Sequence, residues 1–126
     1  MKLGDLLVEA KLTETDFQTA PIERVERYLD FEEVFDPAEL IRSGDRIPGY
    51  QLIRGVLAAH ASGESFCVFC DARRSDLIEK WHSVIRAVRS YNLRSRMKVL
   101  TWQELATALP APLQQFLGTK YGINPG

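Results

Sequence analysis

The sequence has no long hydrophobic run, few cysteines and histidines, and no glycine-rich phosphate loop. Its longest apolar stretches are far shorter than the ~20 residues that a membrane helix needs, and its start lacks the apolar region of a signal peptide. We therefore expect a cytoplasmic protein. The two cysteines and two histidines lack the spacing of a disulfide framework or a zinc site. The glycines match no nucleotide-binding fingerprint.

What is present indicates a single soluble domain over residues 1–126, because 45% of the residues are hydrophobic and 26% are charged. The net charge of −1 conceals an uneven distribution. Residues 1–45 carry 12 acidic and 5 basic side chains, whereas residues 46–126 carry 5 acidic and 11 basic ones. The basic part either faces a phosphate backbone, forms the solvated face of a helix, or meets the acidic part.

Hydrophobic periodicity and capping residues predict an α/β fold with strands separated by helices. This order favours a small, mostly parallel sheet with helical crossovers. Asp36, Ser75 and Thr101 are the expected helix caps, and Thr101 forms a capping box with Glu104. The expected strands are 6–11, 65–70 and 97–100, and the expected helices are 21–29, 38–41, 50–61, 75–91, 102–109 and 110–117.

The strand Leu6–Lys11 carries the first candidate site, because its period of two places Glu9 and Lys11 on the same face. A glutamate oxygen suits a hard divalent cation, and a neighbouring lysine can orient water or stabilise charge on a phosphate. The alternative is an ordinary edge strand with a solvated charged face.

Five segments together resemble the PD-(D/E)xK, or restriction-endonuclease-like, nuclease superfamily. More narrowly, they resemble a bacterial, uncharacterised, nuclease-related branch of it. The resemblance covers nearly the whole chain. The segments are Glu9-Ala10-Lys11-Leu12-Thr13-Glu14, Tyr50-Gln51-Leu52-Ile53-Arg54, Phe66-Cys67-Val68-Phe69-Cys70-Asp71, Leu100-Thr101-Trp102-Gln103-Glu104-Leu105 and Phe116-Leu117-Gly118-Thr119-Lys120-Tyr121-Gly122-Ile123.

The resemblance implies a three-layer α/β core in which two acids bind Mg²⁺ for the hydrolysis of nucleic-acid phosphodiesters. Glu9 would be a metal ligand, and Lys11 would position the nucleophile. Gln51 matches a glutamine that many members carry on the helix after the (D/E)xK strand. These three residues are the expected catalytic set.

The family's other acid belongs on a strand upstream of Glu9, and the chain departs from the pattern there. Asp5 is the only acid among the eight preceding residues, and it lies about 13 Å of strand rise away. Glu14 is a second residue that could replace the missing acid. We therefore expect an N-terminally truncated core, either an Mg²⁺-dependent nuclease or a non-catalytic binding module on the same fold. An exposed edge at the Glu9 strand would be covered by a second copy, giving a homodimer, or by residues 31–35.

Other residue groups give weaker signals. Arg73 and Arg74 are candidates for nucleic-acid binding, although a solvent-exposed loop explains them equally well. Cys67 and Cys70 suggest a redox protein only remotely, because alternation along a strand directs their sulfurs to opposite faces. Trp102 is expected in the core or in contact with a nucleobase.

Overall fold

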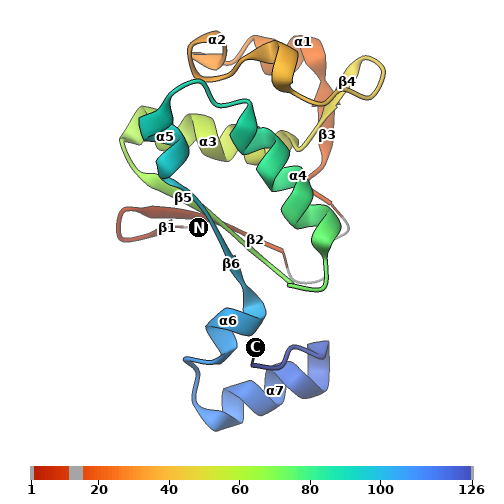
Figure 1. Ribbon diagram of the computed structural model, residues 1–126, viewed down its shortest axis with the longest axis vertical. Helices are drawn as coiled ribbons and strands as arrows, with labels where there is room; N and C mark the ends of the chain where they lie inside the picture. Colours follow the sequence, from red (N-terminus) through yellow and green to blue (C-terminus); the bar gives the residue numbers. More distant parts are fainter. Residues whose placement is uncertain (1, 12–15, 126) are drawn as a thin grey trace.

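The computed structural model describes residues 2–11 and 16–125 and has a central sheet with helices on both of its faces (Figure 1). No helix in these ranges has the length and apolar character needed to cross a membrane. The elements are β1 (Lys2–Leu3), β2 (Leu6–Ala10), β3 (Thr19–Pro21), α1 (Ile22–Glu26), α2 (Phe31–Val34), the 3₁₀ helix η1 (Pro37–Glu39), β4 (Arg46–Pro48), α3 (Tyr50–Ser62), β5 (Ser65–Cys70), α4 (Ser75–Arg86), α5 (Tyr91–Ser95), β6 (Met97–Thr101), α6 (Trp102–Ala106) and α7 (Ala111–Tyr121).

The main sheet has the strand order β1-β2-β5-β6. Strands β2, β5 and β6 run parallel, and β1 pairs antiparallel with β2. Helix α3 lies between β2 and β5 in sequence, and α4 and α5 lie between β5 and β6, as parallel connections require. The predicted α/β class and mostly parallel sheet are confirmed.

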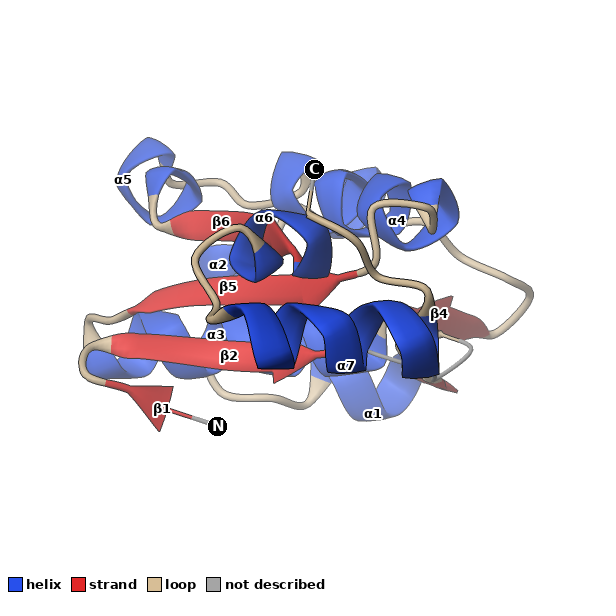
Figure 2. Cartoon of the chain, turned by 90° about the horizontal axis from the view of Figure 1, so that it is seen from below, coloured by secondary structure: helices blue, strands red, loops and turns tan. Residues whose placement is uncertain are grey.

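Helices α3 and α4 cover one face of the sheet, and α6 and α7 lie on the other (Figures 1 and 2). The main hydrophobic core lies on the α3–α4 side. Its largest side chain, Trp81, is fully buried, packs edge-on against Phe66 and donates its indole N–H to the Lys98 carbonyl oxygen at 2.9 Å. Buried indoles usually find such a partner, so this hydrogen bond fixes α4 to β6.

The strand register places the chemistry-bearing residues at the carboxyl edge of the sheet. Glu9 stands opposite Val68, and the Lys11 N–H donates to the Phe69 carbonyl oxygen at 2.8 Å. Parallel strands end at the same edge, so Asp71, which follows β5, lies at this edge as well. Ligands of α/β sheets usually bind at the carboxyl ends of strands.

The predicted exposed edge at β2 is wrong over its first half, because β1 pairs with it at Leu6 and Leu7. Residues 31–35 do not cover the sheet edge either. Phe35 instead forms an antiparallel bridge with Val88. The sequence offered little signal for β1, since it has only two residues and precedes a glycine turn.

The predicted helix 75–91 is too long, because the bridge between Phe35 and Val88 interrupts it. Helix α4 ends at Arg86, after which the Arg89 N–H donates to the Val34 carbonyl oxygen at 2.8 Å. Pairing with a distant segment therefore replaces the helical hydrogen bonds. Ser75 is the first helical residue rather than the cap, whereas the capping box at Thr101 and the Asp36 cap are confirmed.

Both cysteines are free and buried. The Cys70 side chain belongs to the main hydrophobic core. Cys67 lies on the other face of β5 and is not part of that core. Burial raises the pKa of each thiol to about 11. Both side chains are therefore protonated near neutral pH, which disfavours the redox alternative because thiolates are the reactive form.

Candidate functional site

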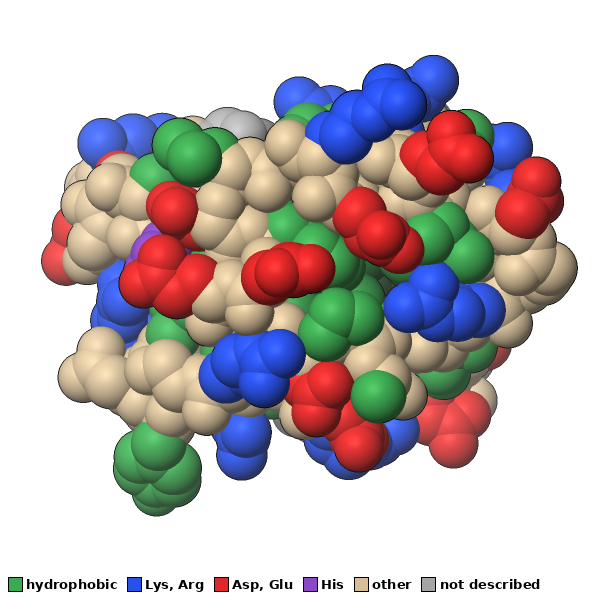
Figure 3. All heavy atoms as spheres, turned by 90° about the horizontal axis from the view of Figure 1, so that it is seen from above, with side chains coloured by type: hydrophobic (Ala, Val, Ile, Leu, Met, Phe, Trp, Pro, Cys, Tyr) green, Lys and Arg blue, Asp and Glu red, His purple; other side chains and the backbone are tan. Residues whose placement is uncertain are grey.

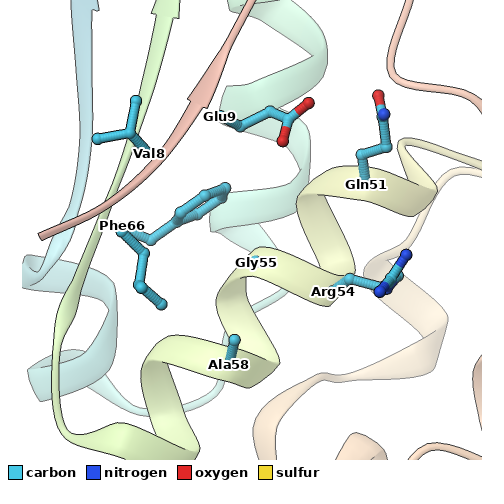
Figure 4. A pocket seen from close by; sticks show the side chains of 8 residues that line it. Val8, Glu9, Gln51, Arg54, Gly55, Ala58 and Phe66 are labelled. Atoms are coloured by element: carbon cyan, nitrogen blue, oxygen red, sulfur yellow. The ribbon is translucent and has the colours of Figure 1, made fainter. Parts of the chain in front are cut away.

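A cavity of about 310 Å³ lies between the carboxyl half of β2 and the first turns of α3 (Figure 4). We call it the Glu9 pocket. Its lining includes Glu9, Gln51, Arg54, Gly55 and Phe66. The structure thus brings Glu9 and Gln51 to one cavity although they are far apart in sequence. In Figure 4 both polar side chains lie at the same end of the pocket.

Gln51 reaches the pocket because the start of α3 is anchored to the segment that follows β2. The N–H groups of Tyr50 and Gln51 donate to the carbonyl oxygens of Gln18 and Phe17, at 3.2 and 3.1 Å. Gly55, one turn later, lets the helix approach the sheet. A Cβ atom there would lie 2.2 Å from the Phe66 ring.

The Gln51 side-chain oxygen is buried and has no hydrogen-bond partner within the described ranges. Buried polar atoms are nearly always paired with protein, water or an ion. The Glu9 side chain, which lines the same pocket, is 29% exposed. The pocket therefore presents one carboxylate and one unsatisfied amide oxygen to whatever enters it.

Lys11 is held beside Glu9 with only 6% of its side chain exposed. Its Nζ lies 3.5 Å from Glu9 Oε1 and 5.6 Å from the centre of the Phe17 ring. The Trp102 indole N–H donates to the Lys11 carbonyl oxygen at 2.8 Å. Sequence reasoning missed this role of Trp102. The only signal was its place directly after β6, at the same edge of the sheet.

The donor atoms of the Glu9 pocket fit a hard divalent cation. Mg²⁺ is commonly held by one or two carboxylates and otherwise by water and substrate phosphate oxygens. Glu9 is the carboxylate, and the unpaired Gln51 oxygen is a suitable neutral ligand. Asp5 does not contribute, because it is exposed at the opposite end of β2, where its carbonyl oxygen accepts the Ser65 N–H. Glu14 lies outside the described residues.

Arg73 and Arg74 lie near the same edge, but acids already bind both guanidinium groups. Arg73 donates to both carboxylate oxygens of Asp71 and to the Tyr121 carbonyl oxygen. Arg74 pairs with Asp76 at 2.9 Å. Their binding to nucleic acid stays a prediction, and the visible role of Arg73 is to tie α7 to the sheet.

Asp71→Asn is expected to destabilise the fold by about 1–2 kcal/mol at neutral pH, because the carboxylate is 90% buried and accepts hydrogen bonds from Arg73 and Gln103. These bonds, Arg73 foremost, hold the pKa of Asp71 well below its usual range. Its contribution is therefore full above pH ~4 and is lost at lower pH. Urea midpoints of the variant and the wild type should converge as the pH falls.

Asp76→Asn is the matched control, since this acid is also paired with an arginine but its side chain is 65% exposed. Its midpoint should stay near that of the wild type. Equal losses in the two variants would contradict the assigned role of Asp71.

A second group of possible ligands, from Asp30, Glu33 and His60, has its donor atoms within 4.8 Å of one another. No sequence pattern indicates this group, because α2 and α3 bring the residues together only in the fold. Exposed acidic groups commonly gather without an ion. Figure 3 shows the face that carries α1 and α2, on which acidic side chains are spread among basic ones.

A family model described as "Restriction Endonuclease associating with ARP" matches residues 1–122. No curated protein and no solved structure matches the chain.

Proposed function

Because the chain belongs to the family described as restriction endonuclease associating with ARP, we propose that its Glu9 pocket binds Mg²⁺ and hydrolyses nucleic-acid phosphodiesters. The family match confirms the predicted relation to restriction-endonuclease-like proteins. The observation that carries the proposal is the buried Gln51 oxygen without a partner, in the same pocket as Glu9.

Each residue of the site has a chemical task in this proposal. Glu9 and Gln51 would hold the ion through oxygen. When bound, the ion would supply a Lewis acid for the phosphate and the attacking water. The Lys11 ammonium, fixed beside Glu9, donates hydrogen bonds to that water or to the phosphate oxygen that gains charge. Trp102 positions Lys11 through its backbone.

A non-catalytic binding module is the second candidate. Glu9 is the single carboxylate that lines the pocket among the described residues, and Lys11 already offsets its charge. In this version the domain binds nucleic acid or protein without cleaving it, and two copies pair at the β1 edge as a homodimer. The family description names an association with ARP, which we carry over as a proposed partner.

Cleavage assays separate the two candidates. Purified protein is incubated with supercoiled plasmid and with labelled single-stranded DNA and RNA, with Mg²⁺ or with EDTA. We expect Mg²⁺-dependent cleavage that EDTA stops. Binding without cleavage under all conditions would favour the module, and light scattering would then report whether it is a dimer.

A further inference from the structure

Two arginines and two tyrosines form a cluster beside the Glu9 pocket, and no sequence pattern assigned a role to any of them. Tyr28 and Tyr50 share a hydrogen bond between their hydroxyl oxygens, 2.5 Å apart, and their rings stack with centroids 6.2 Å apart. The Arg54 guanidinium lies 5.6 Å from the centre of the Tyr50 ring. Arg24 lies beside the Tyr50 hydroxyl. We call these four residues the arginine–tyrosine cluster.

The two guanidinium groups of the cluster are free to bind an anion. Arg24 and Arg54 are both exposed, and neither forms an ion pair with an acid in the described parts of the chain. Arg73 and Arg74 differ, because Asp71 and Asp76 already neutralise them.

Tyr50 connects the two arginines. Its ring lies against Arg54, and its hydroxyl group faces Arg24 and Tyr28. The hydrogen bond with Tyr28, and after it the two guanidinium groups, lower the pKa of Tyr50, while the same hydrogen bond raises the pKa of Tyr28. An arginine that rests on an aromatic ring is partly ordered before a ligand arrives, so less entropy is lost on binding.

The cluster is continuous with the candidate active site. Arg54 lines the Glu9 pocket, and Tyr50 directly precedes Gln51 on α3. Arg24, on α1, extends the positive charge away from the pocket. An anion held by Arg54 would therefore lie next to Glu9, and a second one held by Arg24 would lie farther along the same surface.

We propose that the arginine–tyrosine cluster binds the backbone of a nucleic acid strand, with Arg54 on the phosphate nearest the Glu9 pocket and Arg24 on a phosphate farther along. The inference rests on the proposed function and adds the path of the substrate over α1 and α3. Tyr50 acts as a positioning residue for both arginines. Two separate arginines suit the repeated phosphates of a polynucleotide better than they suit a single free anion.

The test is fluorescence anisotropy of labelled single-stranded and duplex DNA and RNA, measured in EDTA so that cleavage does not contribute. Arg24→Gln and Arg54→Gln should each weaken binding about tenfold at low salt. Each should also lower the slope of log affinity against log salt by about 1, since one phosphate contact is lost. Tyr50→Phe keeps the ring under Arg54 and removes only the hydroxyl group beside Arg24. Its loss of affinity should therefore match that of Arg24→Gln alone.

Arg86→Gln is the matched control, because Arg86 is an exposed arginine on α4 outside the cluster, and it should leave affinity and salt slope unchanged. Unchanged binding in Arg24→Gln and Arg54→Gln would overturn the inference while leaving hydrolysis at Glu9 intact if the wild type cleaves. Loss of binding in both variants of a protein that does not cleave would support the inference and overturn the hydrolysis. Absence of binding by the wild type, or inorganic phosphate competing as well as an oligonucleotide, would overturn the inference.

Discussion

Glu9→Gln is expected to reduce Mg²⁺-dependent cleavage at least about 100-fold and to leave the fold intact. Glu9 supplies the carboxylate of the Glu9 pocket, and the substitution keeps its shape while removing the charge that a divalent ion requires. Losing one group that stabilises the transition state commonly costs a factor of this size. Initial rates of cleavage, together with urea midpoints, measure the two effects separately.

Asp5→Asn is the matched control, because it makes the same acid-to-amide change at the opposite end of β2, on an exposed side chain. It should cleave at the wild-type rate. A Glu9→Gln protein that keeps its activity would contradict the assignment, and equal losses in the two variants would indicate an effect of overall charge.

Gly55→Ala is expected to destabilise the domain by about 3 kcal/mol, despite the usual preference for alanine in helices. The added Cβ would lie 2.2 to 2.6 Å from three atoms of the Phe66 ring. This ring also packs edge-on against Trp81, whose side chain is fully buried, so it has little room to move. Urea unfolding, followed by tryptophan fluorescence, reports the loss.

Gly118→Ala in α7 is the control, because its Cβ would meet mainly the end of the Asn124 side chain, which can turn aside. This variant should be as stable as the wild type or more so. Combining Gly55→Ala with Phe66→Leu should recover part of the lost stability, since the clash is removed. Wild-type stability in Gly55→Ala alone would contradict the close packing of α3 on the sheet.

The sequence predicted the parts of the fold and site that depend on local pattern. Alternation along β2 predicts Glu9 and Lys11 on one face, as found. Gln51, expected at the site from the family resemblance, lies on α3 and lines the Glu9 pocket. The buried strand β5 is apolar from Phe66 to Cys70, as expected for a strand covered on both sides.

Features that depend on contacts between distant segments were not predictable in this way. The Lys11–Trp102 hydrogen bond joins residues 91 positions apart, and the Tyr28–Tyr50 bond joins the turn after α1 to the start of α3. The β3–β4 ladder has only three residues on each side, and neither of its segments is among the expected strands. Neither periodicity nor propensity signals such pairings, because tertiary packing determines them.

Diffraction from crystals grown with Mn²⁺, recorded for its anomalous signal, tests the central claim most directly. The Glu9 pocket should hold one ion about 2 Å from a Glu9 carboxylate oxygen and from the Gln51 side-chain oxygen, and this peak should vanish in Glu9→Gln. An empty Glu9 pocket, with or without an ion at Asp30, Glu33 and His60, would contradict the account.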